Sequence, residues 1–156
     1  MNSLNLMNEQ VIGIYGKSGT GKTTLITGII KKLSNEGLKI ATIKITNKNI
    51  EVDTKGKDTW KHSEAGAGLV VLSSPKETDF LIKKHKDISK IITLINQIDK
   101  YDLIIVEGAN DKDTPKIRIG DIDKRDNTIF TYLGNLEEVI EYLKTNVIGG
   151  INDNKS

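Results

Sequence analysis

The apolar residues of this chain fall into short runs that polar, glycine-containing segments separate. Runs rich in β-branched residues predict strands, because such side chains fit a pleated, buried surface. The predicted strands are residues 11–15, 39–45, 69–72, 103–106 and 128–133. The run LIIV at 103–106 is apolar at every position, so we expect this strand in the centre of a sheet.

Helices are predicted between these strands, where apolar residues recur at helical spacing or capping residues mark a start. The expected helices are 25–37, 60–65, 88–98 and 136–144. Asp87 and Asn135 precede two of them as N-caps, and Gly37 closes the first with a left-handed cap. Strands that alternate with helices predict an α/β fold with a mainly parallel sheet and helices on both faces.

A glycine-rich motif follows the first predicted strand directly. It reads Gly16-Lys17-Ser18-Gly19-Thr20-Gly21-Lys22-Thr23, which matches G-x-x-x-x-G-K-[ST], and Thr24 completes the candidate nucleotide-binding residues. The glycines let backbone N–H groups turn toward phosphate oxygens, and the next helix directs its positive end to the same anion. We expect catalytic Lys22 to contact the β- and γ-phosphates and Thr23 to ligate Mg²⁺, so the fold is a three-layer P-loop NTPase.

An acid ends the fourth predicted strand. In P-loop proteins an acid at this point faces Mg²⁺ or orients the attacking water, so Glu107 is a candidate catalytic residue and metal ligand. The alternative is an exposed strand-end acid. Asp102, at the opposite end of the same strand, is expected at the surface or as a cap. Lys17 resembles the signature lysine of partition-type P-loop ATPases, which reaches a partner's nucleotide, and is otherwise a solvated loop residue.

The polar segment 52–67 leaves the second predicted strand at the end of the sheet where ligands bind. Asp53 is a candidate Mg²⁺ ligand, and Lys57 and Asp58 are candidates for contacts with phosphate or a partner. A solvated loop is the alternative for all three. Trp60 and the small residues 65–68 are expected to pack in the interior, and the other interpretation is a dimer or cofactor surface.

The amino-acid composition disfavours several classes of function. The 156 residues include 23 basic and 21 acidic residues, two histidines and no cysteine, which excludes disulfides and weighs against a metal-delivering GTPase. The balanced charge does not suggest nucleic acid. Without a membrane-length apolar run or a signal peptide, we expect a cytoplasmic protein that binds no membrane. The length predicts one P-loop domain at 10–148, with a frayed N-terminus at 1–9 and a flexible tail at 149–156.

Arginine is scarce among the basic residues, since only Arg118 and Arg125 are present. Small P-loop kinases close an arginine-rich lid over their substrates, so a small-molecule kinase is the least favoured function. The same scarcity predicts slow turnover without a partner, because P-loop proteins that lack a finger arginine react about 10³–10⁵-fold more slowly. Arg118 is the candidate to act in trans.

Further motifs occur in a fixed order along the chain. They are the P-loop, Lys44 near the end of the second strand, the stretch from Asp53 to Thr59, Ala65-Gly66-Ala67, Glu107-Gly108 and Pro115-Lys116-Ile117. With these motifs the chain resembles the molybdopterin-guanine dinucleotide biosynthesis protein B (MobB) family over residues 11–119. It departs from that family at 45–48, where the usual histidines are absent.

The resemblance implies a Mg²⁺-dependent GTP-binding accessory protein with weak GTPase activity in molybdenum or tungsten cofactor biosynthesis. It also implies a homodimer that assists the molybdopterin guanylyltransferase MobA, and a candidate ligand in molybdopterin or its guanine dinucleotide. No residue is assigned to guanine selectivity, so ATP stays open beside GTP. A partition-type P-loop ATPase and a nucleotide-dependent scaffold are the alternative functions.

Overall fold

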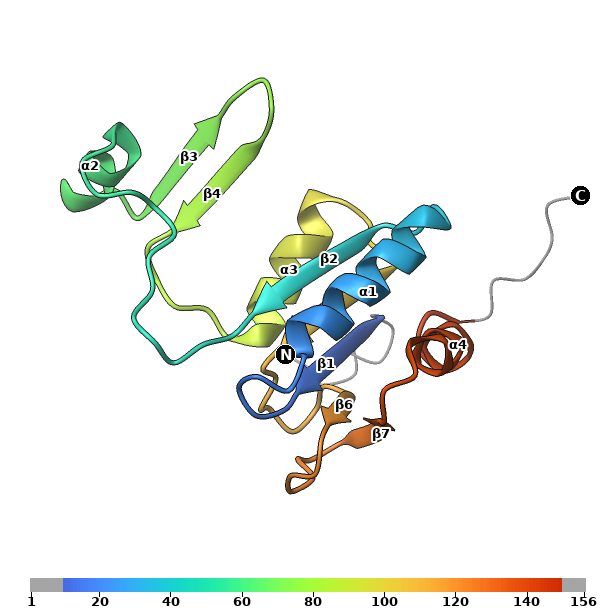
Figure 1. The fold of residues 1–156 in the computed structure, drawn as a ribbon. Helices are drawn as coiled ribbons and strands as arrows, with labels where there is room; N and C mark the ends of the chain where they lie inside the picture. Colours follow the sequence, from blue (N-terminus) through green and yellow to red (C-terminus); the bar gives the residue numbers. More distant parts are fainter. Residues whose placement is uncertain (1–9, 150–156) are drawn as a thin grey trace, which may run out of the picture. The chain divides into compact units, whose positions relative to one another are not determined.

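A computed structural model describes residues 10–149, so the predicted frayed end at 1–9 and the tail beyond Gly149 lie outside the described residues. The elements are β1 (Val11–Tyr15), α1 (Lys22–Asn35), β2 (Ile40–Lys44), α2 (Asp58–Glu64), β3 (Leu69–Ser73), β4 (Thr78–Ile82), α3 (Ile88–Ile98), β5 (Leu103–Glu107), β6 (Lys116–Ile119), β7 (Thr128–Tyr132) and α4 (Leu136–Asn146) (Figure 1). They divide between two compact units. The P-loop unit comprises the residues up to Thr46 and from Ile92 on, and the hairpin unit comprises Asn47–Ile91.

The P-loop unit is built on a five-stranded sheet with the order β2-β5-β1-β6-β7. All neighbouring strands in it are parallel, which confirms the predicted α/β class. β5 and β1 lie inside the sheet, and every residue of these two strands except Glu107 is buried. β6 was not predicted as a strand, because charged residues at 116 and 118 interrupt its apolar pattern.

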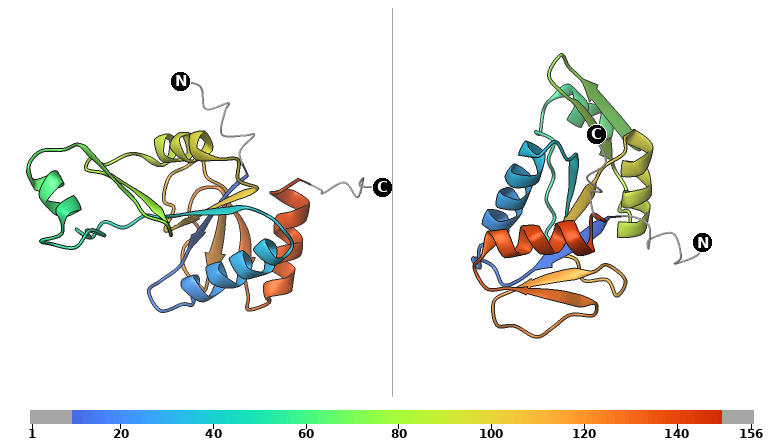
Figure 2. Two further views of the ribbon diagram at one scale, coloured as in Figure 1. Left: turned by 90° about the horizontal axis from the view of Figure 1, so that it is seen from above. Right: turned by 90° about the vertical axis from the view of Figure 1, so that its right-hand side faces the viewer.

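Helices cover both faces of this sheet, as predicted. α1 and α4 lie on one face and α3, from Ile92 on, lies on the other (Figure 2). The main core forms on the first face, between α1, α4 and alternate residues of β1, β5 and β6. Leu33 and Leu143 of the two helices are fully buried there. On the other face Ile92 is the buried residue of α3. The amphipathic spacing of the helices therefore determines which side chains enter the core.

The predicted caps at Gly37, Asp87 and Asn135 are confirmed, although α1 begins at Lys22, three residues before the predicted start. Asn135 Oδ1 accepts hydrogen bonds from the backbone N of Glu137 at 3.1 Å and of Glu138 at 3.4 Å. Asp87 Oδ1 accepts from the backbone N of Lys90 at 2.9 Å. Gly37 follows α1 with a φ of 86°, a left-handed conformation that glycine adopts without a steric penalty.

The hairpin unit differs from the prediction. The strand expected at 69–72 exists, but it does not join the parallel sheet: β3 pairs antiparallel with β4 in a separate two-stranded sheet. The turn between them folds the chain back, since Ser74 N donates to the backbone O of Glu77 at 2.9 Å. Ser74 Oγ also accepts from Glu77 N at 3.1 Å. This local turn makes antiparallel pairing with the next segment the shortest connection.

The prediction that the small residues 65–68 pack in the interior is wrong, since all four are exposed. A Cβ added at Gly66 or Gly68 would meet no atom of a non-neighbouring residue within 4 Å. The helix before them, α2, has only seven residues and buries none of them, and Trp60 is half-buried. A helix this short has too little apolar surface to cover the residues that follow it.

Candidate functional site

The P-loop begins where β1 ends. Gly16 is tightly enclosed, because a Cβ at this position would lie 2.8 Å from Thr20 Oγ1 and 2.9 Å from the backbone O of Ile119. Gly19 and Gly21 have φ angles of 76° and 88°, in the left-handed region. The three motif glycines are therefore required by close approach at the first position and by backbone conformation at the other two.

Lys22 folds back over this loop. Its Nζ donates to the backbone O of Gly16 at 2.9 Å and of Lys17 at 2.6 Å. Thr20 Oγ1 donates to the same oxygen of Lys17 at 2.8 Å. These bonds hold an ammonium charge against the loop backbone at the start of α1. A Cβ at Gly19 or Gly21 would meet no atom within 4 Å, so no side chain covers the loop backbone at these two positions. Uncovered backbone N–H groups of such a loop suit a phosphate group.

The N-terminus of α1 adds to this anion site. Gly21 is its N-cap and offers no side-chain cap, and its first turn carries no acidic residue. The backbone N–H groups of that turn are therefore left for an anion, which the helix dipole also favours. Thr23 and Thr24 are exposed in this turn. The structure thus brings together the predicted P-loop residues 16–24.

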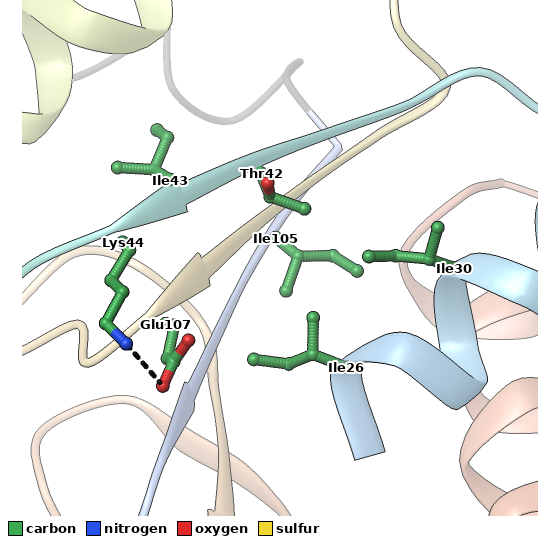
Figure 3. Close-up of a pocket in the computed structure, with 7 residues that line it drawn as sticks. All are labelled: Ile26, Ile30, Thr42, Ile43, Lys44, Ile105 and Glu107. Carbon is green, nitrogen blue, oxygen red and sulfur yellow. Dashed lines mark ion pairs between the residues drawn. The ribbon is translucent and has the colours of Figure 1, made fainter. Parts of the chain in front are cut away.

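Glu107 lies beside this loop. It is the last residue of β5 and stands in register with Ile14 of β1, two residues before the P-loop. On its other side it stands in register with Lys44, the last residue of β2. Lys44 Nζ lies 3.8 Å from Glu107 Oε1, with side-chain exposures of 67% and 20% (Figure 3). Both line a groove of about 100 Å³ whose apolar wall includes Ile26 and Ile105.

The oxygen donors here suit Mg²⁺, which prefers carboxylate and hydroxyl ligands. Glu107 and Thr23 are the candidate donors in the P-loop unit. Among residues 10–149 no group of three or more His, Asp or Glu side chains could hold a metal ion. Mg²⁺ in nucleotide sites is usually bound by one or two protein oxygens, phosphate oxygens and water. The donors present therefore fit a site that a bound nucleotide completes.

Tyr15 anchors two loops next to the P-loop, a feature that the sequence did not suggest. The Arg125 guanidinium lies 4.6 Å from the centroid of the Tyr15 ring, and its Nη1 donates to the backbone O of Ala109 at 2.7 Å. The Tyr15 hydroxyl accepts from Arg125 N at 2.9 Å and bonds to Thr128 Oγ1 at 2.7 Å. The turn after Glu107 and the loop after β6 thus share one anchor on the residue before the P-loop. A tyrosine that ends an otherwise apolar strand was the available signal.

Two further cations are held inside the P-loop unit. Lys116 is fully buried and donates to the backbone O of Thr114 at 2.7 Å and of Asp126 at 2.9 Å. Arg118 Nη1 donates to the backbone O of Ile122 at 2.6 Å. Because Arg118 is engaged in its own loop, its geometry does not favour the expected role in trans.

Asp111 stabilises the turn between β5 and β6. Its Oδ1 accepts from the backbone N of Thr114 at 2.7 Å and of Asp113 at 3.0 Å. Burial alone would raise the pKa of Asp111, but these hydrogen bonds and the charge of Lys116 together hold that pKa below its ordinary value of 3.8.

The remaining predicted site residues belong to the hairpin unit. Asp53 Oδ1 accepts from Thr54 N and from Thr59 Oγ1, both at 2.9 Å, and so stabilises the turn into α2. Asp58 pairs with Lys61 at 3.4 Å, and Lys57 is the N-cap residue of α2. These contacts give Asp53 and Asp58 local roles. Contacts of Asp53, Lys57 and Asp58 with Mg²⁺ or nucleotide stay predictions.

Within residues 10–149 no helix is both long and apolar enough to cross a lipid bilayer. The model of the family "Molybdopterin guanine dinucleotide synthesis protein B" (MobB) matches residues 11–141. The molybdopterin-guanine dinucleotide biosynthesis adapter protein of Haemophilus influenzae is 36% identical over 115 residues, which are 71% of this chain and 64% of that protein. The adapter protein of the same name from Escherichia coli is 33% identical over 104 residues, 64% of this chain and 59% of that protein. The chain thus spans less than two thirds of the length of these curated relatives.

Solved structures share the fold. The crystal structure of Bacillus subtilis MobB superimposes with a TM-score of 0.67 at 20% identity and covers 86% of this chain and 98% of that one. A crystal structure described as molybdopterin-guanine biosynthesis protein B (mobB) has a TM-score of 0.62 at 27% identity and covers 85% and 95% of the two chains. The family match over residues 11–141, the identity to the curated relatives and the shared fold agree, and the chain belongs to the MobB family.

Proposed function

We propose that this chain is a Mg²⁺-dependent GTP-binding accessory protein, with weak GTPase activity, in the biosynthesis of molybdopterin guanine dinucleotide. The observation that carries the proposal is the P-loop, in which Lys22 Nζ is held against the backbone oxygens of Gly16 and Lys17. Membership in the MobB family supplies the pathway. The relatives are named adapter proteins, which supports an accessory role over a stand-alone enzyme.

Each residue of the site has a distinct task in this proposal. The backbone N–H groups of 19–24 and the Lys22 ammonium bind the phosphates. Thr23 and Glu107 hold Mg²⁺, which neutralises charge on the phosphate oxygens when it is bound. Glu107 also orients the water that attacks the terminal phosphate. GTP is preferred to ATP on the family resemblance alone, because no described side chain is assigned to the base.

Turnover is expected to be slow, because both arginines are used inside the fold. Arg118 bonds to Ile122 O and Arg125 bonds to Ala109 O, so both guanidinium groups are engaged within the chain. P-loop proteins without a finger arginine react about 10³–10⁵-fold more slowly than those with one. A turnover below about 1 s⁻¹ without a partner is therefore expected.

The partner proposed for this activity is a molybdopterin guanylyltransferase, MobA-like, and molybdopterin or its guanine dinucleotide is the proposed further ligand. The pathway name of the family supports both. The residues at 45–48 lack histidine, so a pterin would have to be recognised through other groups. Cytoplasmic location stays part of the prediction.

The hairpin unit supports a homodimer. Leu69 stands in register with Ile82 and Val71 with Phe80, so these four side chains lie together on one face of the hairpin. Their exposures are 52%, 42%, 47% and 55% in the same order. An isolated two-stranded hairpin is marginally stable in water, and an uncharged apolar face of this kind is typical of an interface. A second copy offers the same face in a two-fold arrangement, which would cover both.

Sedimentation analysis tests the dimer. We expect Phe80→Ser to raise the dissociation constant about tenfold or more, because it removes a phenyl ring from the proposed interface. Thr78→Ala, on the same face of the same strand but polar, is the control and should leave the constant unchanged. A wild-type chain that sediments as a monomer at micromolar concentration would remove the dimer from the proposal.

Calorimetric titration with GTP and ATP, each with Mg²⁺, tests the nucleotide site. Lys22→Ala should weaken GTP binding about 100-fold or more, because the ammonium group makes charge-assisted bonds to phosphate. Lys31→Ala is the matched control, since Lys31 is an exposed lysine on the same helix. Retained binding in Lys22→Ala would contradict the nucleotide site. A clear preference for ATP would favour the partition-type ATPase, for which the exposed Lys17 is the supporting residue.

A further inference from the structure

Two lysine–carboxylate pairs flank β2 in the P-loop unit. At its amino end Lys39 Nζ donates to Asp99 Oδ2 at 2.9 Å, and both side chains are at least half exposed. At its carboxyl end Lys44 Nζ lies 3.8 Å from Glu107 Oε1, which is beyond hydrogen-bond distance. The second pair is unequal, because the lysine is 67% exposed and the glutamate is 20% exposed.

We propose that Lys44 is the counter-ion of Glu107 in the nucleotide-free protein and that Mg²⁺ must displace it, so that Lys44 sets the Mg²⁺ concentration that nucleotide binding requires. Lys44 is then a positioning residue that acts through Glu107. The inference rests on the proposed function, since it takes Glu107 as the acid that faces Mg²⁺.

The geometry makes Lys44 the group that competes for Glu107. Glu107 Oε1 faces the Lys44 ammonium, and the side chains of Ile26, Ile30 and Ile105 line the same groove (Figure 3). Glu107 forms no other ion pair in the described part of the chain. Apolar walls strengthen the attraction between the two charges relative to bulk water. A divalent cation that binds Glu107 would have to displace Lys44 from the carboxylate, and the positive charge of Lys44 would also repel it.

The same geometry makes the displacement easy. A contact at 3.8 Å without a hydrogen bond constrains the lysine weakly, and exposed ion pairs contribute little to stability. Lys44 is the last residue of β2, and its exposed side chain can turn to water while its backbone stays in the sheet. A nucleotide brings several negative charges, which attract Mg²⁺ and offset the repulsion from Lys44. Lys44 therefore disfavours the bare cation more than the cation that arrives with a nucleotide.

The measurement is the Mg²⁺ concentration that half-saturates binding of a fluorescent GTP analogue, together with the affinity for that analogue in the absence of Mg²⁺. Lys44→Met keeps the aliphatic stem and removes the charge. We expect it to lower the half-saturating Mg²⁺ concentration about three- to tenfold, because a single charge near a divalent ion in a partly exposed site is worth this much. Lys44→Arg should restore the wild-type value.

Two controls separate this effect from general electrostatics. Lys39→Met removes an equal charge from the other end of β2 and should leave the Mg²⁺ requirement unchanged. In a Glu107→Gln background, Lys44→Met should have a much smaller effect, because the ion pair is already absent and only the direct repulsion between Lys44 and Mg²⁺ remains.

The outcomes are distinct. An unchanged Mg²⁺ requirement in Lys44→Met would overturn the inference and leave the proposed nucleotide site intact. A loss of affinity in Lys44→Met without Mg²⁺ would also overturn it, since Lys44 would then bind phosphate directly. A wild-type chain that binds the analogue without any response to Mg²⁺ would overturn both the inference and the proposed Mg²⁺ site.

Discussion

The P-loop unit of this chain buries most of its large apolar side chains, whereas the hairpin unit leaves many of its own exposed. In the P-loop unit, α1, α4 and alternate strand residues enclose a core in which Ile105 and Leu143 are fully buried. In the hairpin unit Val70 is the buried apolar residue, whereas Phe80 and Leu69 are more than half exposed. Both units contain leucine, isoleucine, valine and phenylalanine, so the difference in burial comes from the elements that pack over these side chains.

Only the P-loop unit has enough helices and strands to bury its own apolar side chains. A parallel sheet buries both faces, because its crossover helices pack against it. A two-stranded hairpin with one seven-residue helix beside it has too few elements to do so. The proposed nucleotide site is accordingly on the unit that folds around its own core. The apolar surface that a partner can cover is on the other unit, which agrees with the adapter role in the names of the relatives.

The largest expected effect is on the free energy of unfolding, when an apolar side chain is truncated in the core of the P-loop unit and another in the hairpin unit. Leu33→Ala removes a fully buried side chain of α1, and we expect a loss of about 2–5 kcal/mol in the free energy of unfolding. Leu72→Ala truncates a side chain of β3 that is 44% exposed and lies on the hairpin face opposite Phe80, so a loss of about 1 kcal/mol or less is expected. Denaturant unfolding of both variants at one protein concentration measures the difference. Equal losses would contradict the comparison.

A smaller loss of stability is expected when one helix N-cap residue from each unit is replaced by alanine. Asn135 caps α4 of the P-loop unit, and Asp87, in the hairpin unit, caps α3. Asn135→Ala and Asp87→Ala should each cost about 1 kcal/mol, because each leaves helix N–H groups without a side-chain acceptor. Thermal unfolding followed by circular dichroism provides the measurement, and the conservative variants Asn135→Asp and Asp87→Asn are the controls. If Asp87→Ala has no effect, the start of α3 is not stabilised by its cap.

The smallest effect is a pH dependence that belongs to the P-loop unit. The pKa of Asp111 is lowered in the folded chain, so its carboxylate stabilises the fold above the ordinary value of 3.8, and this contribution is lost as the pH falls through the lower folded value. We expect Asp111→Asn to make the unfolding free energy less sensitive to acid below about pH 4, by about 1 kcal/mol or less because the group is partly exposed. Urea unfolding at pH 7 and pH 3 measures this change. If Asp111→Asn is as sensitive to acid as the wild type, other carboxylates cause the acid sensitivity.

Local signals were sufficient for much of the site. The spacing of Gly16, Gly21 and Lys22 identifies the phosphate loop because backbone conformation and charge are needed at those positions whatever surrounds them. The caps at Asp87 and Asn135 were equally visible, since a cap acts within three residues. The apolar run before Glu107 predicted a central strand, because a strand covered on both faces has no polar position.

Non-local pairing decided the rest. β3 has the composition of a core strand, and only its antiparallel pairing with β4 shows that it lies outside the parallel sheet. Lys116 is charged and yet fully buried, because backbone oxygens of two separate segments satisfy its ammonium group. Lys44 and Glu107 are 63 residues apart in the chain, and the register of β2 with β5 brings them together. Sequence determines what each segment can do, and tertiary structure decides which segments meet, because sheet order and register depend on contacts between residues far apart in the chain.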